Sequence, residues 1–192
     1  MAKYSPETRE RLMKNETSIR AVVPFSNGHI VTLGFPGLAF DIQGEAFIDP
    51  ERFHATMDAP EFEPCQILIV LVETDEVPEE GWALLKNKAA DKSFRLELMP
   101  IEDYQVPDQA FMARWAAIST NIDDCLAEGG TVALSCHYGA GRSGTMAARL
   151  LMDRGYSMQQ AVDALRSRFP ESIESKKQIE WLEQATDGSD NA

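Results

Sequence analysis

Short apolar runs alternate with amphipathic segments along most of the chain. The clearest run covers residues 66–72, QILIVLV, which is continuously apolar and rich in β-branched residues. A strand buried on both faces has this pattern, whereas a strand with one face in water alternates between apolar and polar side chains. We therefore expect residues 66–72 to form a central strand in a sheet that is covered on both sides.

Further strands are predicted at both sides of this run. They are residues 19–25, 29–37, 93–99 and 131–135. The first two flank the turn sequence SNG, which is typical of a hairpin, and residues 93–99 alternate between apolar and polar positions. Residues 38–64 contain Pro, Gly and Asp at irregular spacing, so this segment predicts irregular backbone with a short helix over 50–57.

Helical periodicity is strongest after Pro107. Five apolar residues recur there at helical spacing, and they are Phe111, Trp115, Ile118, Ile122 and Leu126. The sequence EGG at 128–130 ends this helix. The sequence SMQQ at 157–160 is a capping box that opens a helix running to about residue 169. The other predicted helices are residues 5–16, 76–89, 142–153 and 175–185.

Strands and helices therefore alternate, with long connections between the strands. This order indicates an α/β fold with a mainly parallel central sheet and helices on both faces. The chain contains no internal repeat and no linker-like segment, so it predicts a single domain. We assign residues 1–18 to an N-terminal extension, 19–185 to the folded domain and 186–192 to a disordered tail.

Composition and charge narrow the range of partners. The 192 residues are 44% hydrophobic, which is enough for one packed core. The net charge of −13 opposes binding to nucleic acid and to anionic lipid. No apolar run is long enough for a membrane span, and the first residues lack a secretory apolar region. We expect a cytoplasmic protein without nucleic-acid or membrane partners, and the oligomeric state stays open.

The three cysteines are Cys65, Cys125 and Cys136. Their odd number and unpaired spacing indicate a reducing compartment. No clustered His and Cys pattern predicts a metal site, and we expect no cofactor. In a parallel sheet Cys65 and Cys125 would lie at the opposite edge from Cys136, roughly 20 Å away, which is too far for a disulfide.

The segment 135–144, SCHYGAGRSG, joins the strand at 131–135 to the helix at 142–153. Gly139 and Gly141 let the backbone curl tightly, because glycine adopts positive φ without steric cost. A curled loop entering a helix points several amide N–H groups at one spot, where the helix dipole adds positive charge. Such a loop suits a tetrahedral dianion. The candidate substrate-binding residues are His137, Tyr138, Gly139, Ala140 and Gly141.

Three side chains at this loop have chemical roles. Cys136 lies at the rim, where the same field favours the thiolate and makes it a nucleophile. Arg142 has a planar fork that can grip two phosphate oxygens. The Ser143 hydroxyl can donate a hydrogen bond to the sulfur when it leaves. The loop therefore predicts phosphoryl transfer through Cys136.

The pattern Cys136-x-x-Gly139-x-x-Arg142-Ser143 resembles the active-site loop of the cysteine-dependent protein tyrosine phosphatase superfamily, especially its dual-specificity branch. The resemblance covers residues 19–185 in layout, which makes this range the phosphatase-like catalytic domain. It implies hydrolysis of phosphate monoesters through a phosphocysteine intermediate, without a metal. The implied substrates are a phosphorylated protein or a small phosphate ester.

The resemblance also implies a general acid upstream of the cysteine. Asp103 in PIEDYQVP is similar to the family aspartate that protonates the leaving oxygen, and we expect it to be partly buried. Glu102 and Asp108 are neighbouring acids that leave an alternative open. Gln178 resembles a family glutamine that positions water, while an exposed helical amide is the other interpretation.

One position departs from the family pattern. The residue before the cysteine is usually histidine and here is Ser135, which either weakens the thiolate or makes an equivalent bond to the backbone. A loop that binds phosphorylated ligands without turnover is therefore an alternative function. Sulfur transfer and arsenate reduction also use a cysteine in an anion-binding loop. The sequence HYGAG between Cys136 and Arg142 contains no Lys or Arg, which favours phosphoprotein, with phosphotyrosine and also phosphoserine or phosphothreonine, over phosphoinositide.

Overall fold

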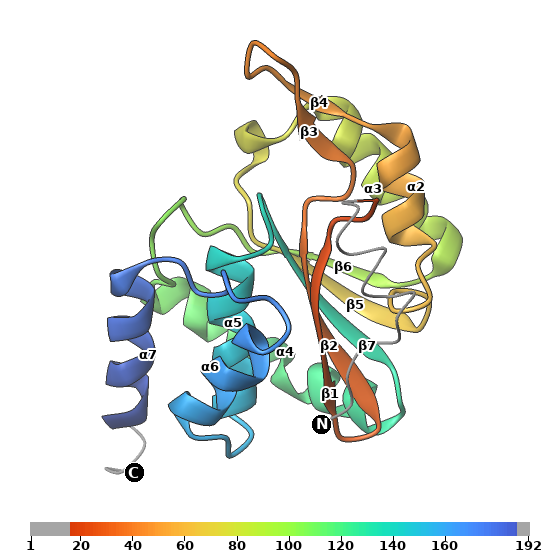
Figure 1. Ribbon diagram of the computed structural model, residues 1–192. Coiled ribbons are helices and arrows are strands. Elements are labelled where there is room, and N and C mark those ends of the chain that lie inside the picture. The colour runs from red at the N-terminus through yellow and green to blue at the C-terminus, as the bar shows by residue number, and fades with distance from the viewer. Residues whose placement is uncertain (1–15, 188–192) are drawn as a thin grey trace.

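The computed structural model describes residues 16–187, and a five-stranded sheet forms its centre (Figure 1). Along the sheet the strands are β1 (Ile19–Phe25), β2 (Gly28–Gly34), β7 (Thr131–Cys136), β5 (Cys65–Val70) and β6 (Arg95–Leu98). Only β1 is antiparallel to its neighbour, and the other four strands are parallel. The predicted α/β fold with a mainly parallel sheet is confirmed.

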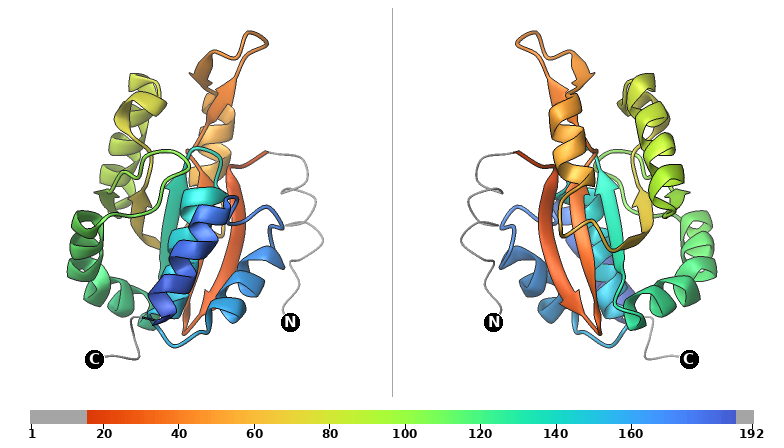
Figure 2. Two further views of the ribbon diagram at one scale, coloured as in Figure 1. Left: turned by 90° about the vertical axis from the view of Figure 1, so that its left-hand side faces the viewer. Right: turned by 90° about the vertical axis from the view of Figure 1, so that its right-hand side faces the viewer.

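Within residues 16–187, six α-helices cover the two faces of the sheet. They are α2 (Pro50–Met57), α3 (Glu79–Lys92), α4 (Gln109–Ala127), α5 (Gly141–Met152), α6 (Met158–Arg166) and α7 (Lys176–Asp187). Helices α4 to α7 lie on one side of the sheet and α2 and α3 on the other (Figures 1 and 2). This cover explains why every residue of β7 is buried.

Strand register brings the carboxyl ends of the central strands together. Gly34 at the end of β2 lies beside Cys136 at the end of β7, and Val70 at the end of β5 lies beside Ser135. The carboxyl edge of a parallel sheet is where ligands bind in open α/β folds. The loop that follows Cys136 therefore starts at the edge of the sheet suited to a ligand site.

The segment 38–64 contains more structure than its sequence predicts. Strands β3 (Leu38–Phe40) and β4 (Ala46–Ile48) form a hairpin that projects beyond the sheet (Figures 1 and 2). Each strand has three residues, too few for the alternation of apolar and polar positions to be visible. Gly37 begins the hairpin with a φ of 75°. A Cβ there would lie 2.8 Å from the Asp49 carbonyl oxygen, so this tight approach requires glycine.

Other element boundaries differ from the sequence predictions by a few residues. Strand β2 ends at Gly34, before residue 37, and α6 ends at Arg166, before residue 169. Helix α3 begins at Glu79 because Pro78 is its N-cap, and the preceding residues Thr74–Glu76 form the 3₁₀ helix η1. This shift places Glu76 in a connection at the end of the sheet.

The two ends of the chain were predicted to be a helix over 5–16 and a tail over 186–192. The predicted helix over 5–16 lies outside the described residues except for Glu16, which has no regular structure. Helix α7 continues to Asp187 and so includes the first two positions of the predicted tail, while residues 188–192 are not described. Within 16–187, no helix combines the length and the hydropathy needed to cross a membrane.

Candidate active site

The predicted anion-binding loop lies between β7 and α5. Gly139 has a φ of 96°, and a Cβ at this position would lie 2.4 Å from the backbone nitrogen of Gly34. Only glycine therefore fits where the loop crosses the end of β2. This conformation lets the Gly139 N–H donate to Cys136 Sγ at 3.2 Å. The loop thus curls back over the sulfur, as the sequence predicts.

Cys136 is the final residue of β7 and is 3% exposed. Its sulfur lies 3.4 Å from the hydroxyl oxygen of Ser143 in the first turn of α5. It also faces a small pocket of about 70 Å³. The residues lining this pocket are Asp103, Tyr104, Cys136, His137, Tyr138, Arg142, Glu174 and Gln178. Sequence segments that lie far apart therefore meet around one sulfur atom.

Arg142 is held in place by Glu76, which the sequence analysis did not identify. The two guanidinium NH groups donate to the two Glu76 carboxylate oxygens at 2.5 and 2.6 Å, and one also donates to the Ile101 carbonyl at 2.9 Å. Burial alone would lower the pKa of Arg142, but the Glu76 hydrogen bonds raise it above its ordinary value. The Arg142 guanidinium is therefore fixed in orientation and positively charged.

The same ion pair acts on Glu76. Burial would raise the pKa of this carboxyl, but hydrogen bonds from Arg142 and the Arg142 charge hold it below its ordinary value of 4.5. Glu76 therefore remains ionised beside Arg142 down to acidic pH. Glu76 lies on the 3₁₀ helix η1 and does not line the pocket at Cys136, so it orients the arginine without contacting the pocket itself.

Asp103 lies at the pocket beside Arg142. Its Oδ1 is 3.2 Å from the Arg142 guanidinium, and its side chain is 57% exposed. The expected partial burial is therefore wrong. The carboxylate lies on the solvent side of the pocket because its loop follows β6 across the carboxyl edge of the sheet. Its position at the pocket, and not burial, distinguishes it from the other acids.

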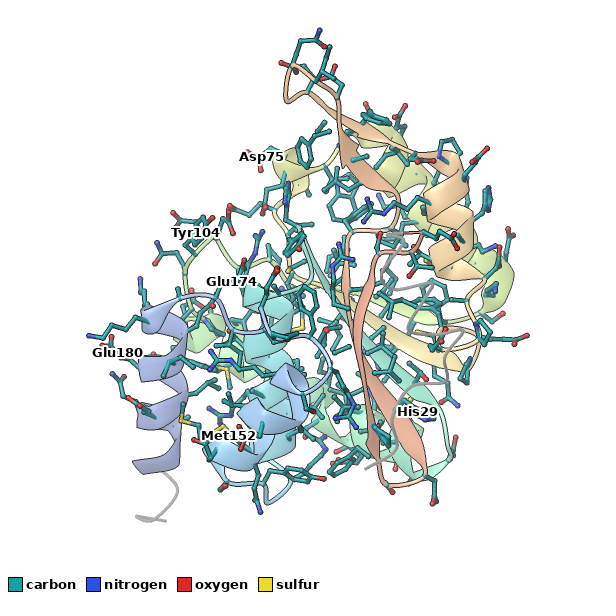
Figure 3. All side chains as sticks on the ribbon, in the orientation of Figure 1. His29, Asp75, Tyr104, Met152, Glu174 and Glu180 are labelled. Carbon is teal, nitrogen blue, oxygen red and sulfur yellow. The ribbon has the colours of Figure 1, made fainter. Side chains whose placement is uncertain are left out.

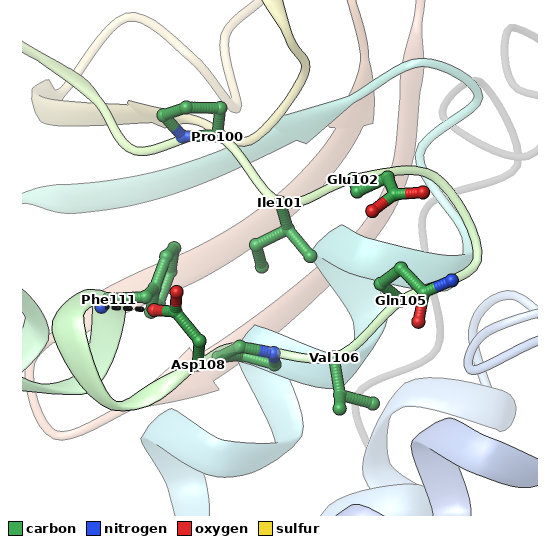
Figure 4. Close-up of a pocket in the computed structure, with 8 residues that line it drawn as sticks. Pro100, Ile101, Glu102, Gln105, Val106, Asp108 and Phe111 are labelled. Carbon is green, nitrogen blue, oxygen red and sulfur yellow. Dashed lines mark hydrogen bonds between the residues drawn. The ribbon is translucent and has the colours of Figure 1, made fainter.

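The neighbouring acid Asp108 has a different position. Its side chain caps α4 by accepting a hydrogen bond from the Phe111 N–H at 2.7 Å (Figure 4). Together with Glu102, it lines a separate cavity of about 280 Å³ beneath the 100–108 loop (Figure 4). Neither acid lines the pocket at Cys136. Geometry therefore favours Asp103 among the three acids of this loop.

The remaining predicted residues of the loop also surround the sulfur. His137 and Tyr138 line the pocket, and Tyr138 is 44% exposed. Ala140 and Gly141 are buried where the loop enters α5. The predicted substrate-binding segment is thus arranged with side chains at its rim and backbone at its base.

Gln178 lies on α7 and is 2% exposed, so the interpretation as an exposed amide is wrong. Its Oε1 accepts hydrogen bonds from the backbone N–H groups of Glu174 and Ser175, both at 3.1 Å. Its Nε2 is directed at the loop, since a Cβ at Gly141 would lie 3.1 Å from it. The structure therefore brings this amide to the pocket that contains Cys136.

Glu174 is a pocket residue that the sequence analysis missed. It precedes α7 and faces the 103–104 loop across the pocket (Figure 3). Partial burial and the charges of Asp103 and Glu171 raise its pKa, while the Gly141 N–H opposes the rise. A carboxylate at the entrance to an anion site weakens the local positive field.

Ser135 makes no side-chain hydrogen bond to any described residue, although it is fully buried. Of the two alternatives for Ser135, the equivalent bond to the backbone is therefore absent from the part of the chain that the structure describes. Arg20 on β1 supports the loop from another direction, because its Nε donates to the Tyr138 carbonyl at 3.0 Å. Nothing in the local sequence signals this contact, since the two residues are 118 positions apart.

Comparison with known proteins agrees with this geometry. Residues 54–187 match the model of the dual specificity phosphatase catalytic domain family, so the chain belongs to this family. A search of curated proteins found no match. The family assignment makes the chain a member of the cysteine-dependent phosphatases.

Solved structures share the fold at low sequence identity. Kinase associated phosphatase with its catalytic cysteine substituted by serine has a TM-score of 0.69 and 21% identity, covering 91% of this chain and 96% of that one. Tk-PTP in the active form gives 0.59 and 22%, covering 88% and 97%. PTPMT1 in complex with PI(5)P gives 0.59 and 15%, covering 87% and 96%. This chain is therefore similar in fold to all three over most of its length.

Proposed function

We propose that the chain is a phosphoprotein phosphatase that hydrolyses phosphotyrosine, and also phosphoserine and phosphothreonine, through a phosphocysteine intermediate. The observation that carries the proposal is the position of Cys136 Sγ. It lies 3.2 Å from the Gly139 N–H and 3.4 Å from Ser143 Oγ, in a pocket that also contains Arg142 and Asp103. Nucleophile, anion cradle, clamp and acid are thus within one site.

In the first step the Cys136 thiolate attacks phosphorus and the bond to the leaving oxygen breaks. The proton of Asp103 goes to that oxygen, so the product is an alcohol or phenol. Arg142 and the loop N–H groups hold the other phosphate oxygens while charge redistributes. Because Glu76 fixes both NH groups of Arg142, the clamp needs no reorganisation during the reaction.

In the second step water attacks phosphorus and the bond to Cys136 Sγ breaks. Asp103, now ionised, takes the proton of the water, and the Ser143 hydroxyl donates to the departing thiolate. Gln178 orients the water, because its amide nitrogen faces the loop. The same carboxyl therefore serves as acid in one step and base in the next.

The pocket supports a broad choice of phosphorylated residue. It is small, and the exposed aromatic rings of Tyr104 and Tyr138 stand at its rim. A pocket of this size binds mainly the phosphate group, so it should discriminate little between the side chains that carry the phosphate. A PI(5)P complex is known for the similar PTPMT1 structure. Here the carboxylates of Asp103 and Glu174 at the pocket oppose a multiply charged headgroup, which favours phosphopeptides.

Turnover of phosphopeptides tests the proposal. Purified wild-type protein should hydrolyse phosphotyrosine and phosphothreonine peptides in the presence of a chelator. Cys136→Ser should abolish turnover while still binding the peptide. Asp103→Asn should reduce kcat on the order of 10²-fold or more, as expected for loss of a general acid.

Two variants of neighbouring acids serve as matched controls. Glu102→Gln and Asp108→Asn remove similar charges from the same loop, and the asparagine can still cap α4. Both should keep activity within a few-fold of wild type. Binding without turnover in the wild-type protein would favour the phospho-binding module, and full activity in Cys136→Ser would exclude the phosphocysteine route. Thiosulfate and arsenate assays should show no comparable activity.

A further inference from the structure

The segment 102–106 carries the candidate acid Asp103 and is fixed at both ends. Ile101 before it is 5% exposed, and its backbone N–H donates to the Leu71 carbonyl at 2.9 Å. Asp108 after it caps α4 with its side chain. Between these two points a cavity of about 280 Å³ lies beneath the segment (Figure 4). Side chains that face a cavity lack packing partners on that side, so packing alone does little to hold the segment in place.

Two polar side-chain contacts join this segment to other parts of the described chain, residues 16–187. The first is the ion pair in which Asp103 Oδ1 lies 3.2 Å from the Arg142 guanidinium. The second is a hydrogen bond that Lys177 Nζ, in the first turn of α7, donates to Gln105 Oε1. The other hydrogen bonds of the segment lie within it. The position of Asp103 at the pocket therefore depends on these two contacts.

The first of these contacts cannot last through the reaction. A phosphate bound to Arg142 competes with the Asp103 carboxylate for the same guanidinium. Asp103 must also carry a proton to act as the acid, and protonation removes its charge attraction to Arg142. The hydrogen bond between Lys177 and Gln105 involves neither of these groups. It is therefore the contact that still holds the segment when the leaving oxygen takes its proton.

Lys177 extends from a part of the fold that is itself fixed. The next residue, Gln178, is 2% exposed and lines the pocket at Cys136. Its Oε1 accepts hydrogen bonds from the backbone N–H groups of Glu174 and Ser175, both at 3.1 Å. Leu182 on the same helix is fully buried. The start of α7 is thus a rigid support, from which the exposed lysine side chain reaches the 102–106 segment.

We propose that Lys177 and Gln105 are positioning residues, which hold Asp103 beside the leaving oxygen while the bond from that oxygen to phosphorus breaks. This inference rests on the proposed function and adds to it the support of the general acid. The proton still passes from Asp103 to the leaving oxygen, and neither positioning residue takes part in the transfer. Loss of their hydrogen bond frees the segment to move, and a displacement of about 1 Å is enough to slow a step that depends on alignment.

The dependence of the rate on the leaving group tests the proposal. The probes are dinitrophenyl phosphate, whose leaving group departs without a proton, nitrophenyl phosphate, and phenyl phosphate, whose leaving oxygen needs one. The ratio kcat/KM covers every step up to release of the phenol, so it includes protonation by Asp103. Lys177→Ala should lower kcat/KM about tenfold for phenyl phosphate and less than about twofold for dinitrophenyl phosphate. A merely structural loss would lower the rate for all three substrates equally.

Further variants assign the effect to this hydrogen bond. Gln105→Ala should reproduce the effect of Lys177→Ala, and the double variant should be no slower than either single one, because both remove the same contact. Lys177→Arg retains a donor and should recover most of the rate on phenyl phosphate. Lys176→Ala is the matched control, since this adjacent exposed lysine pairs with Glu180 at 3.0 Å, and it should change no rate by more than about twofold. Thermal unfolding of each variant identifies loss of fold.

Asp103→Asn separates this inference from the proposed function. It should slow phenyl phosphate far more than dinitrophenyl phosphate, and Lys177→Ala added to it should slow phenyl phosphate no further, because the acid is already lost. If Asp103→Asn behaves in this way while Lys177→Ala slows neither substrate or both equally, the positioning role is overturned and the proposed function stands. An additional loss in the double variant would also overturn the positioning role. No effect of Asp103→Asn on phenyl phosphate would overturn the acid assigned in the proposed function and this inference with it.

Discussion

The two ends of β7 show how differently one residue type can be used. Cys136 ends the strand, while Cys65 lies beside Thr131 at its start, roughly 17 Å away along the strand. Both thiols are buried, but only Cys136 faces a pocket with an arginine and a backbone N–H directed at its sulfur. Cys65 instead donates to the Ile67 carbonyl at 3.4 Å.

Burial changes the acidity of the two thiols near the start of β7, Cys65 and Cys125. Burial and the nearby Cys125 raise the pKa of Cys65 far above its ordinary value. Burial and the charge of Glu128 raise the pKa of Cys125 to about 11. A thiol at this end therefore stays protonated and unreactive at neutral pH. The comparison teaches that the groups aimed at the sulfur, and not its burial, determine the chemistry.

The largest expected effect is a difference in reactivity between the three thiols. Brief treatment with iodoacetate near neutral pH should modify Cys136 at least about 100-fold faster than Cys65 or Cys125, because the thiolate is the reactive form. The carboxylate of the reagent also suits the anion-binding loop. Peptide mass spectrometry after timed quenching measures the three rates. Equal modification rates at the three cysteines would contradict the proposed difference in reactivity between Cys136 and the other two thiols.

The next effect concerns the support of Arg142. Glu76→Gln removes the charge that pairs with the buried Arg142, so the fold should be destabilised by about 2–4 kcal/mol. Because Arg142 then loses its fixed orientation, kcat/KM should fall on the order of 10²-fold. Denaturant unfolding and phosphopeptide kinetics measure the two effects. The charge-removing variant Glu80→Gln, on the exposed start of α3, is the control.

The ion pair between Glu76 and Arg142 also makes the free energy of unfolding depend on pH. The pKa of Glu76 is lower in the folded protein than its ordinary value of 4.5, so its contribution to stability is complete above that value. The contribution is lost as the pH falls through the folded pKa. The difference in unfolding free energy between wild type and Glu76→Gln should therefore be constant near neutral pH and shrink below about pH 4. A difference that grows in acid would contradict the ion pair.

A smaller effect is expected from Glu174, whose carboxylate lies at the pocket beside Gly141. Glu174→Gln removes a negative charge next to the incoming phosphate, so KM should fall about threefold to tenfold, as for a partly screened charge. The effect should weaken at high salt. A rise in KM would show that this carboxylate aids binding. Glu171→Gln is the comparison variant. Glu171 accepts a hydrogen bond from the Tyr138 hydroxyl and is not part of the pocket lining.

The smallest effect is expected at Ser135. Its hydroxyl is buried without a partner in the described chain, so Ser135→Ala should leave stability unchanged or raise it by about 1 kcal/mol. Activity should stay within twofold of wild type. A large loss of activity would show that the hydroxyl helps to arrange the loop during the reaction. Thermal unfolding and peptide kinetics provide both measurements.

The sequence was sufficient for the features that depend on local chemistry. The buried strand at 66–72 and the loop from Cys136 to Ser143 follow from apolar patterning, glycine and the strand-to-helix order. The sequence does not show which of the acids at 102, 103 and 108 is the general acid. Only the fold shows that Asp103 lines the pocket while Asp108 caps α4.

Contacts across the fold could not be predicted from local sequence. The sequence predicts Glu76 at the start of a helix, whereas its pairing with Arg142 joins positions 66 residues apart. Arg20 reaches the loop from β1, and the β3–β4 hairpin consists of strands too short to show a period. In each case, the decisive partner is set by how the elements pack and leaves no mark near the residue itself.

The most direct test of the central claim is detection of the covalent intermediate on one cysteine. Wild-type protein is mixed with a ³²P-labelled phosphotyrosine peptide, denatured within milliseconds and digested. Our account predicts that the label is attached to the peptide containing Cys136, builds up with the first turnover and is absent in Cys136→Ser. Rapid turnover with no labelled cysteine, or with label on Cys65 or Cys125, would contradict it.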